Sequence, residues 1–218
     1  MIVRNSRLPR VLFVLAVLAT QSCASTYYNA MEKVGYHKRD ILVSNVEKTR
    51  DAQQEAQIEF KDALEQFSSI VSVENTDLKV SYKKLSAEYE DSQEAAEAVS
   101  DRIDSVESVA KALFREWESE IEQFTNNDYK RTSTRQLRDT RNRYDEMLTS
   151  MRRSEASMKP VLQTFNDNVL FLKHNLNAQA IGSLKGEFDA LQNDIGVLIR
   201  EMNRSIAESD KFIAELRG

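Results

Sequence analysis

The sequence predicts an all-α protein, an elongated antiparallel coiled coil or bundle of four long helices. Apolar residues recur every 3.5 positions over most of the chain, the periodicity of helices that wind around one another. Between Tyr36 and Ile181, in a chain of 218 residues, there is no glycine and only one proline, Pro160. A sheet protein of this length needs turn residues that this stretch lacks, so strands are not expected.

Four helices are predicted, and their bounds are residues 29–71, 76–126, 133–175 and 179–216. Each contains an apolar seam, a row of residues expected to face the other helices. The seams extend over residues 46–70, 78–124, 137–176 and 184–216. The first seam is the sparsest in large apolar residues, so it is expected to pack most weakly.

Polar residues predict the connections between these helices. "SVENTDLK" supplies the first turn, with Asn75 or Thr76 as the N-cap of the second helix, and "TNNDYKRTST" supplies the second, with Ser133 or Thr134 as the next N-cap. A one-residue shift in the seam beside Gly182 indicates the third break. Pro160 is expected to bend the third helix, because the seam continues across it; a new helix starting there is the alternative.

The charges favour antiparallel neighbours. The second helix ends with Glu116, Glu118, Glu120 and Glu122, and the third begins with several arginines. A short turn between the two helices brings these opposite charges side by side. Arg141 occupies a seam position and is expected to extend towards one of the glutamates.

Residues 1–22 have the pattern of an export signal. Three arginines and no acidic residue precede the apolar run "VLFVLAVLAT". Ten residues rise about 15 Å as a helix, half of a bilayer core. Cleavage is therefore expected; an uncleaved anchor over residues 8–19 is the alternative. The predicted organisation is a signal peptide at 1–22, a membrane-proximal tether at 23–35 and one elongated helical coiled-coil domain at 36–218.

Cys23, the single cysteine of the chain, is predicted to be the lipid attachment site. "LATQSC" resembles a lipobox, with the small Ser22 before the cysteine, although Thr20 and Gln21 are atypical of that motif. The alternative is ordinary cleavage that leaves a free thiol, which an oxidising compartment disfavours. Ala24 follows where an aspartate would retain a lipoprotein in the inner membrane. An outer-membrane lipoprotein facing the periplasm is expected, ahead of an inner-membrane or soluble periplasmic protein.

Two surfaces are candidates for contacts. Tyr27 and Tyr28 follow the cysteine, and His37, Lys38 and Arg39 add basic groups, so these five residues could lie near lipid headgroups. Solvated charge at a helix start is the alternative for the last three. At the other end of the predicted rod, the chain is apolar on more than one helix face. A partner could contact Leu170, Phe171 and Ile181 there, or these residues could equally pack between helices.

Nothing in the sequence indicates catalysis. His37 and His174 are predicted at opposite ends of the bundle, no cysteine or histidine pair has metal-ligand spacing, and there is no glycine-rich phosphate loop. Loss of the three signal arginines leaves 27 basic against 35 acidic residues, a formal charge of −8, which disfavours nucleic acid. We therefore expect that the protein binds no cofactor and no metal and has no enzymatic activity.

The sequence resembles a family of coiled-coil lipoproteins of Gram-negative, mainly gammaproteobacterial, bacteria that is defined only as a domain of unknown function. The resemblance lies in "YYNAMEKVGYHKRDIL", "DRIDSVESVAKALFREWESE", "RQLRDTRNRY" and "LKHNLNAQAIGSL". It implies an exported coiled-coil protein and supplies no reaction or cofactor.

The expected function is a scaffold or adaptor in the cell envelope, anchored by lipid and in contact with a protein partner or a second copy. One alternative is a module that binds lipid or another small amphiphile between helices at the first seam. Another is an envelope-stress protein that binds metal or cationic ligands through its acidic faces.

Overall fold

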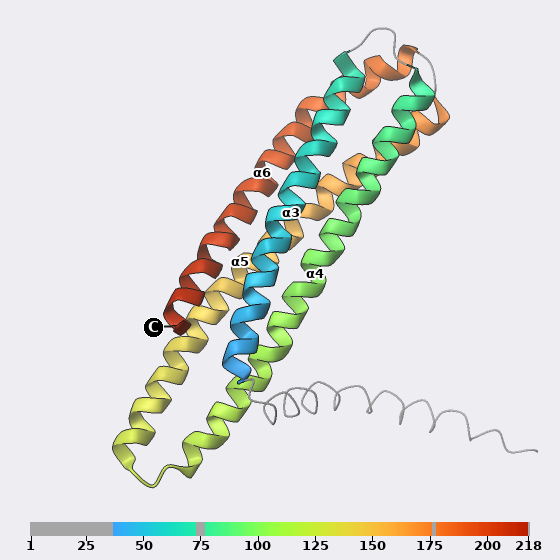
Figure 1. The fold of residues 1–218 in the computed structure, drawn as a ribbon. Helices are drawn as coiled ribbons and strands as arrows, with labels where there is room; N and C mark the ends of the chain where they lie inside the picture. The colour runs from blue at the N-terminus through green and yellow to red at the C-terminus, as the bar shows by residue number, and fades with distance from the viewer. Residues whose placement is uncertain (1–36, 73–76, 176–177, 218) are drawn as a thin grey trace, which may run out of the picture.

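The computed structural model describes residues 37–72, 77–175 and 178–217, which form four long helices (Figure 1). These are α3 (Lys38–Ser72), α4 (Leu78–Gln123), α5 (Asn127–His174) and α6 (Ala178–Arg217). Successive helices alternate in direction and pack side by side, and α3 also packs against α6. The 48 residues of α5 extend about 70 Å. The prediction of an all-α bundle of four long helices is confirmed.

Two N-caps differ from the prediction. The side chain of Asp77 accepts hydrogen bonds from the backbone N–H groups of Lys79 and Val80, so α4 begins one or two residues later than expected. The predicted caps Asn75 and Thr76 lie outside the described residues. The Asp77 carboxylate satisfies N–H groups that the first turn of a helix leaves unpaired.

The start of α5 was predicted too late, and the caps Ser133 and Thr134 are wrong. Asn126 is the N-cap, and its side chain accepts from the N–H groups of Asp128 and Tyr129 at 2.8 and 3.3 Å. Only residues 124–126 separate α4 from α5. The polar stretch after Asn126 therefore forms helix, because the cap and an acidic first turn favour it.

Helix α5 runs without interruption through Pro160 to His174. A new helix starting at Pro160 is therefore excluded. The proline has no backbone N–H group, so the helix interior lacks one hydrogen bond there. The break before α6 falls at residues 175–177, close to its predicted place.

The seams form the core. All eight residues of the first seam between Val46 and Ile70 are at most 1% exposed, so the weak packing expected there is not found. Most described residues of the other three seams are buried or half-buried, and the methionines at 147, 151, 158 and 202, which were expected in the core, are all buried. Phe124 is the exception, because it caps the end of α4 and is 41% exposed.

Within the core, aromatic side chains pack in two clusters, one towards each end of the bundle. Phe67 stacks on Phe188 and meets Phe165 edge to face, with ring centroids 6.0 and 6.4 Å away, which joins α3, α5 and α6. Tyr144 contacts Phe114 and Phe212 at 5.3 and 6.2 Å, which joins α4, α5 and α6. Such pairs add to the stabilisation from their burial.

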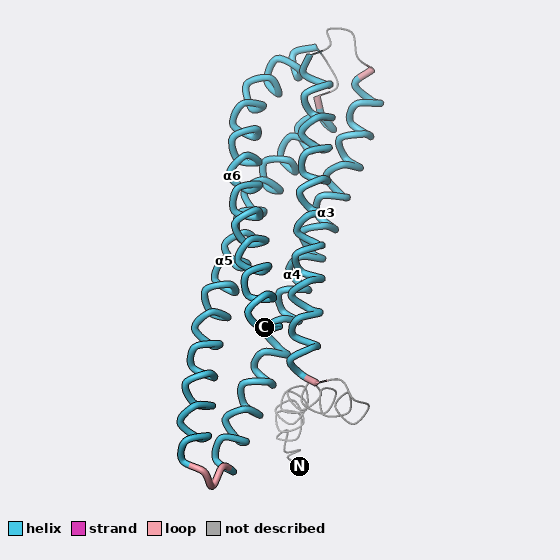
Figure 2. The backbone as a smooth tube through the Cα atoms, turned by 60° about the vertical axis from the view of Figure 1, so that its left-hand side comes forward, coloured by secondary structure: helices cyan, strands magenta, loops and turns pink. Residues whose placement is uncertain are grey.

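The α4–α5 hairpin is longer than the rest of the bundle. Figures 1 and 2 show that its turn projects beyond the start of α3 and the end of α6. Lys38, the first residue of α3, bonds to Glu116 Oε1 at 2.8 Å, so α4 continues for about two turns past that level.

Candidate functional site

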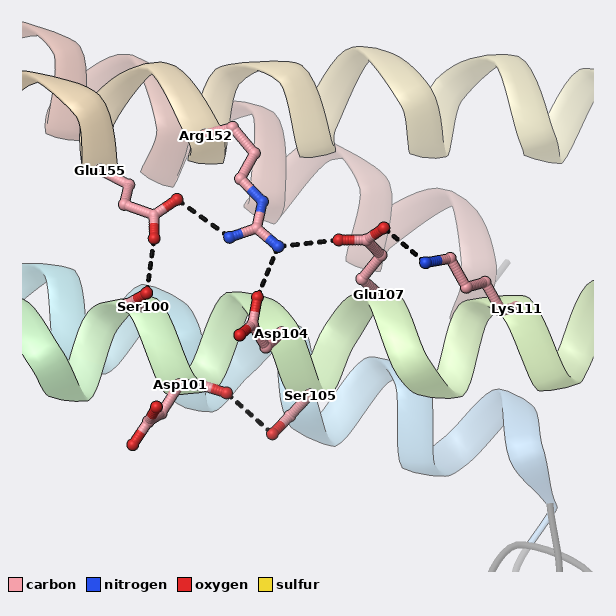
Figure 3. A network of polar contacts seen from close by, with 8 residues as sticks. All are labelled: Ser100, Asp101, Asp104, Ser105, Glu107, Lys111, Arg152 and Glu155. Carbon is pink, nitrogen blue, oxygen red and sulfur yellow. Dashed lines mark hydrogen bonds and ion pairs between the residues drawn. The ribbon is translucent and has the colours of Figure 1, made fainter. Parts of the chain in front are cut away.

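The densest polar network of the described residues joins α4 to α5 around Arg152 (Figure 3). The Arg152 guanidinium donates to Asp104 and Glu107 of α4 at 2.6 and 2.7 Å, and to Glu155 of its own helix at 3.0 Å. Glu155 also accepts from the Ser100 hydroxyl at 2.5 Å, and Glu107 pairs with Lys111 at 2.7 Å. The network therefore spans about three turns of α4 on one face of the hairpin.

The electrostatics of this network favour fixed charges. Burial lowers the pKa of Arg152, but the hydrogen bonds that it donates to its three carboxylate partners outweigh burial and leave the pKa above its ordinary value. Hydrogen bonds from Lys111 and Arg152 lower the pKa of Glu107 below its ordinary 4.5. Arg152 and Glu107 therefore stay charged near neutral pH, and their ion pair clamps α4 to α5.

A second polar group lies in the core between the two aromatic clusters. The fully buried Gln53 of α3 donates from Nε2 to Ser154 Oγ of α5 at 2.7 Å and to Ser205 Oγ of α6 at 3.0 Å. Ser154 Oγ in turn donates to the Met151 carbonyl at 2.8 Å. Gln53 Oε1 has no partner among the described residues. One amide thus joins three helices through hydroxyl groups.

The phenol of Tyr144 lies in the core beside the α4–α5 network. Burial raises the pKa of this phenol, and the negative charge of Glu107 adds to the effect. Its hydroxyl has no hydrogen-bond partner within the described residues. The phenol remains neutral, and the contacts of its ring with Phe114 and Phe212 identify Tyr144 as a packing residue.

An acidic groove lies between α3 and α4. Glu55, Glu59, Asp91 and Glu94 line it above small alanine side chains, and none of the four carboxylates forms an ion pair with a described residue. Desolvation and neighbouring carboxylates raise the pKa of Glu59. Within residues 37–72, 77–175 and 178–217, no group of three or more His, Cys, Asp or Glu side chains could hold a metal ion.

The predicted anchor lies outside the described residues, as do Cys23, Tyr27 and Tyr28. Of the basic residues beside them, His37 and Arg39 are exposed at the start of α3. Lys38 is only 3% exposed and its ammonium group bonds to Glu116, so it faces α4 and not a headgroup. The cluster predicted to contact lipid is thus divided between solvent and the helix interface.

The predicted partner surface lies at the opposite end of the bundle from the start of α3. Leu170 and Phe171 are 44% and 37% exposed near the end of α5. The side chain of Ile181 lies outside the described residues. His174 also lies at this end, so the two histidines are far apart, as predicted.

The sequence identified one contact of the hairpin and missed its largest network. Arg141 donates to Glu118 at 2.9 Å and lies 5.0 Å from the Phe114 ring centre, which confirms the prediction that it reaches a glutamate. Arg152 was overlooked, because the charge pattern of the sequence pointed only to the residues next to the turn. The antiparallel register that pairs Glu118 with Arg141 also brings Glu107, eleven residues before Glu118, to Arg152, eleven residues after Arg141, and that spacing is the signal that could have found the network.

The described residues define a class of protein: an all-α bundle whose buried and bridging polar groups join helices to one another. No described helix is long and apolar enough to cross a membrane. The chain belongs to the family described as Protein of unknown function (DUF2959), whose model matches residues 27–216. No curated protein and no solved structure matches it.

Proposed function

We propose that the chain is a lipid-anchored scaffold of the envelope of a Gram-negative bacterium. Cys23 carries the lipid, the protein faces the periplasm from the outer membrane, and the helical bundle holds a protein contact surface away from the bilayer. The bundle works as a spacer and adaptor and carries out no reaction.

One observation carries this proposal: the bundle is a long rod whose two ends differ. The chain enters α3 at one end, and Leu170 and Phe171 are exposed at the other. Buried seams on all four helices and the Arg152 clamp resist bending of the rod. An apolar pair at the far end of a stiff helical rod suits a protein partner better than a soluble ligand.

The alternative of an amphiphile held between helices has lost its supporting feature. That hypothesis depended on loose packing of the first seam, and the eight residues of this seam are buried. We therefore propose no ligand within the bundle.

The anchor is tested by mass spectrometry of the protein purified from bacterial membranes. The expected product begins at Cys23 and carries the added mass of acyl chains, and a Cys23→Ser variant should lose this modification and leave the membrane fraction. A wild-type chain with an unmodified thiol would contradict the anchor.

The contact surface is tested by crosslinking in intact cells. A photo-reactive amino acid at Leu170 should give a discrete crosslinked product. The same amino acid at Val197, which has the same 44% exposure on the middle of α6, is the matched control. Equal crosslinking from both positions, or none from Leu170, would contradict the adaptor proposal.

A further inference from the structure

The end of the α4–α5 hairpin carries two exposed aromatic rings. Lys38 at the start of α3 bonds to Glu116, and Trp117 bonds to Ser133 across the hairpin, so we call residues 117–133, which lie beyond that level, the hairpin tip. Phe124 is 41% and Tyr129 64% exposed, and their rings meet edge to face with centroids 6.4 Å apart. The two rings contact each other at the extreme end of the bundle.

The rings are well held by the tip itself. Trp117 Nε1 donates to Ser133 Oγ at 2.8 Å and links the two helices behind the turn, where Ile121 is buried. The Asn126 cap fixes the start of α5 between Phe124 and Tyr129. The exposed rings therefore project from an ordered turn, so that little conformational entropy is lost when they are buried.

The four charged residues nearest the two rings form two ion pairs, while Glu118 and Glu120 lie farther back on α4. Lys130 pairs with Glu122 at 2.7 Å, and Arg131 pairs with Asp128. The remaining residues of the turn, Thr125 to Asn127, are uncharged. A turn with an apolar ring, a phenol and paired charges matches the headgroup region of a bilayer, which favours amphipathic aromatic rings.

The position of the hairpin tip favours the membrane as the surface that the two rings contact. The tip lies at the end of the bundle where α3 begins, and the lipid anchor proposed above would precede α3 by only 14 residues. Fully extended, that segment spans about 50 Å at most. It would hold this end of the bundle close to the bilayer.

We propose that the hairpin tip places Phe124 and Tyr129 in the headgroup region of the membrane to which Cys23 is anchored. This inference rests on the proposed lipid anchor and adds a second point of contact, made by protein side chains. The two contacts together hold the bundle at a fixed orientation on the membrane.

The test uses the acylated full chain reconstituted in vesicles of phosphatidylethanolamine and phosphatidylglycerol with brominated acyl chains. The single tryptophan, Trp117, is replaced by phenylalanine, and a new tryptophan is introduced as Phe124→Trp. The matched control carries Phe171→Trp in the same background, at the opposite end and with a similar exposure of 37%. Circular dichroism checks that both variants keep the helical content of the wild type.

We expect both variants to float with the vesicles. Tryptophan at position 124 should lose most of its emission to the bromines and shift to shorter wavelength, while tryptophan at position 171 should do neither. If the proteins float but the emission of tryptophan at position 124 is not quenched, or that at position 171 is quenched equally, the inference is wrong. The exposed rings of the tip would then be assigned to contact with a protein partner. Failure to float would instead refute the anchor, and the inference with it.

A second measurement keeps the native Trp117, which α4 places about 10 Å from Phe124. Replacing both rings by alanine should reduce the quenching of Trp117 without loss of flotation. Unchanged quenching would also overturn the proposal, and this variant changes only exposed side chains.

Discussion

Replacing Arg152 by methionine removes the centre of the α4–α5 network while it keeps most of the aliphatic stem. The side chain is 34% exposed and loses three ion pairs, to Asp104, Glu107 and Glu155. Glu107 keeps Lys111 and Glu155 keeps Ser100, so no carboxylate is left buried without a partner. Partly exposed pairs contribute about 0.5–1 kcal/mol each, which gives an expected loss of about 2 kcal/mol in the free energy of unfolding.

The measurement is urea and thermal unfolding followed by circular dichroism. A loss of about 2 kcal/mol lowers the Tm of a chain of this size by about 4–8 °C. The loss should be smaller in high salt, because the pairs are partly screened. Arg153→Met is the matched control, since Arg153 is exposed and forms no ion pair with a described residue; its effect should stay within about 0.5 kcal/mol.

The pH dependence gives a further check on the same variant. Lys111 and Arg152 lower the pKa of folded Glu107 below 4.5, so its contribution to stability is present above the unfolded pKa and is lost as the pH falls through the folded pKa. Without Arg152 the folded pKa moves back towards 4.5. The difference between wild type and Arg152→Met should therefore shrink on acidification below about pH 4.5. Equal stability of Arg152→Met and Arg153→Met at neutral pH would refute this account of the network.

Substitutions at three more sites, Asn126, Gln53 and Pro160, test the fold by the same unfolding assay. Asn126→Ala removes the α5 cap and should lower the free energy of unfolding by about 1 kcal/mol. Thr134→Ala changes a residue that the sequence suggested as a cap and should lower it by less than about 0.5 kcal/mol. The reverse order would indicate that α5 begins near residue 134. Gln53→Met loses two hydrogen bonds but no longer buries an unpartnered oxygen, so its free energy of unfolding should stay within about 1 kcal/mol of wild type. Gln53→Ala leaves a cavity and should lose about 3 kcal/mol. Equal losses in the two variants would indicate that Oε1 is satisfied. Pro160→Ala should stabilise the chain by about 1–3 kcal/mol by restoring a helix hydrogen bond at an exposed site, and a loss of stability would show that the packing of α5 requires the proline.

The periodicity of the sequence predicted the helices and their seams because burial follows the 3.5-residue repeat directly. All eight first-seam residues from Val46 to Ile70 are buried, although Thr49 and Gln53 weaken the apolar pattern. What the pattern could not supply was the partner of each polar seam residue. Gln53 pairs with Ser154 and Ser205, which lie more than 100 positions away in the chain.

Helix ends were predicted less well than helix faces. Several polar residues near each turn could serve as caps, and the choice depends on local backbone geometry that sequence does not reveal. The error at the start of α5 concealed the short turn at the hairpin tip. Phe124 was assigned to a seam, and only the three-residue turn after α4 shows that it is exposed.

The buried amide of Gln53 fixes how the helices are aligned along their axes. Seams that repeat every seven residues allow one helix to slide past another by a heptad, about 10 Å, with apolar residues still facing apolar residues. Such a slide of α6 would replace Ser205 by Leu198 or Phe212 opposite Gln53, and a slide of α5 would replace Ser154 by Met147 or Val161. Each wrong alignment would leave the amide N–H group without an acceptor in the core, so a single polar side chain sets the length of the rod.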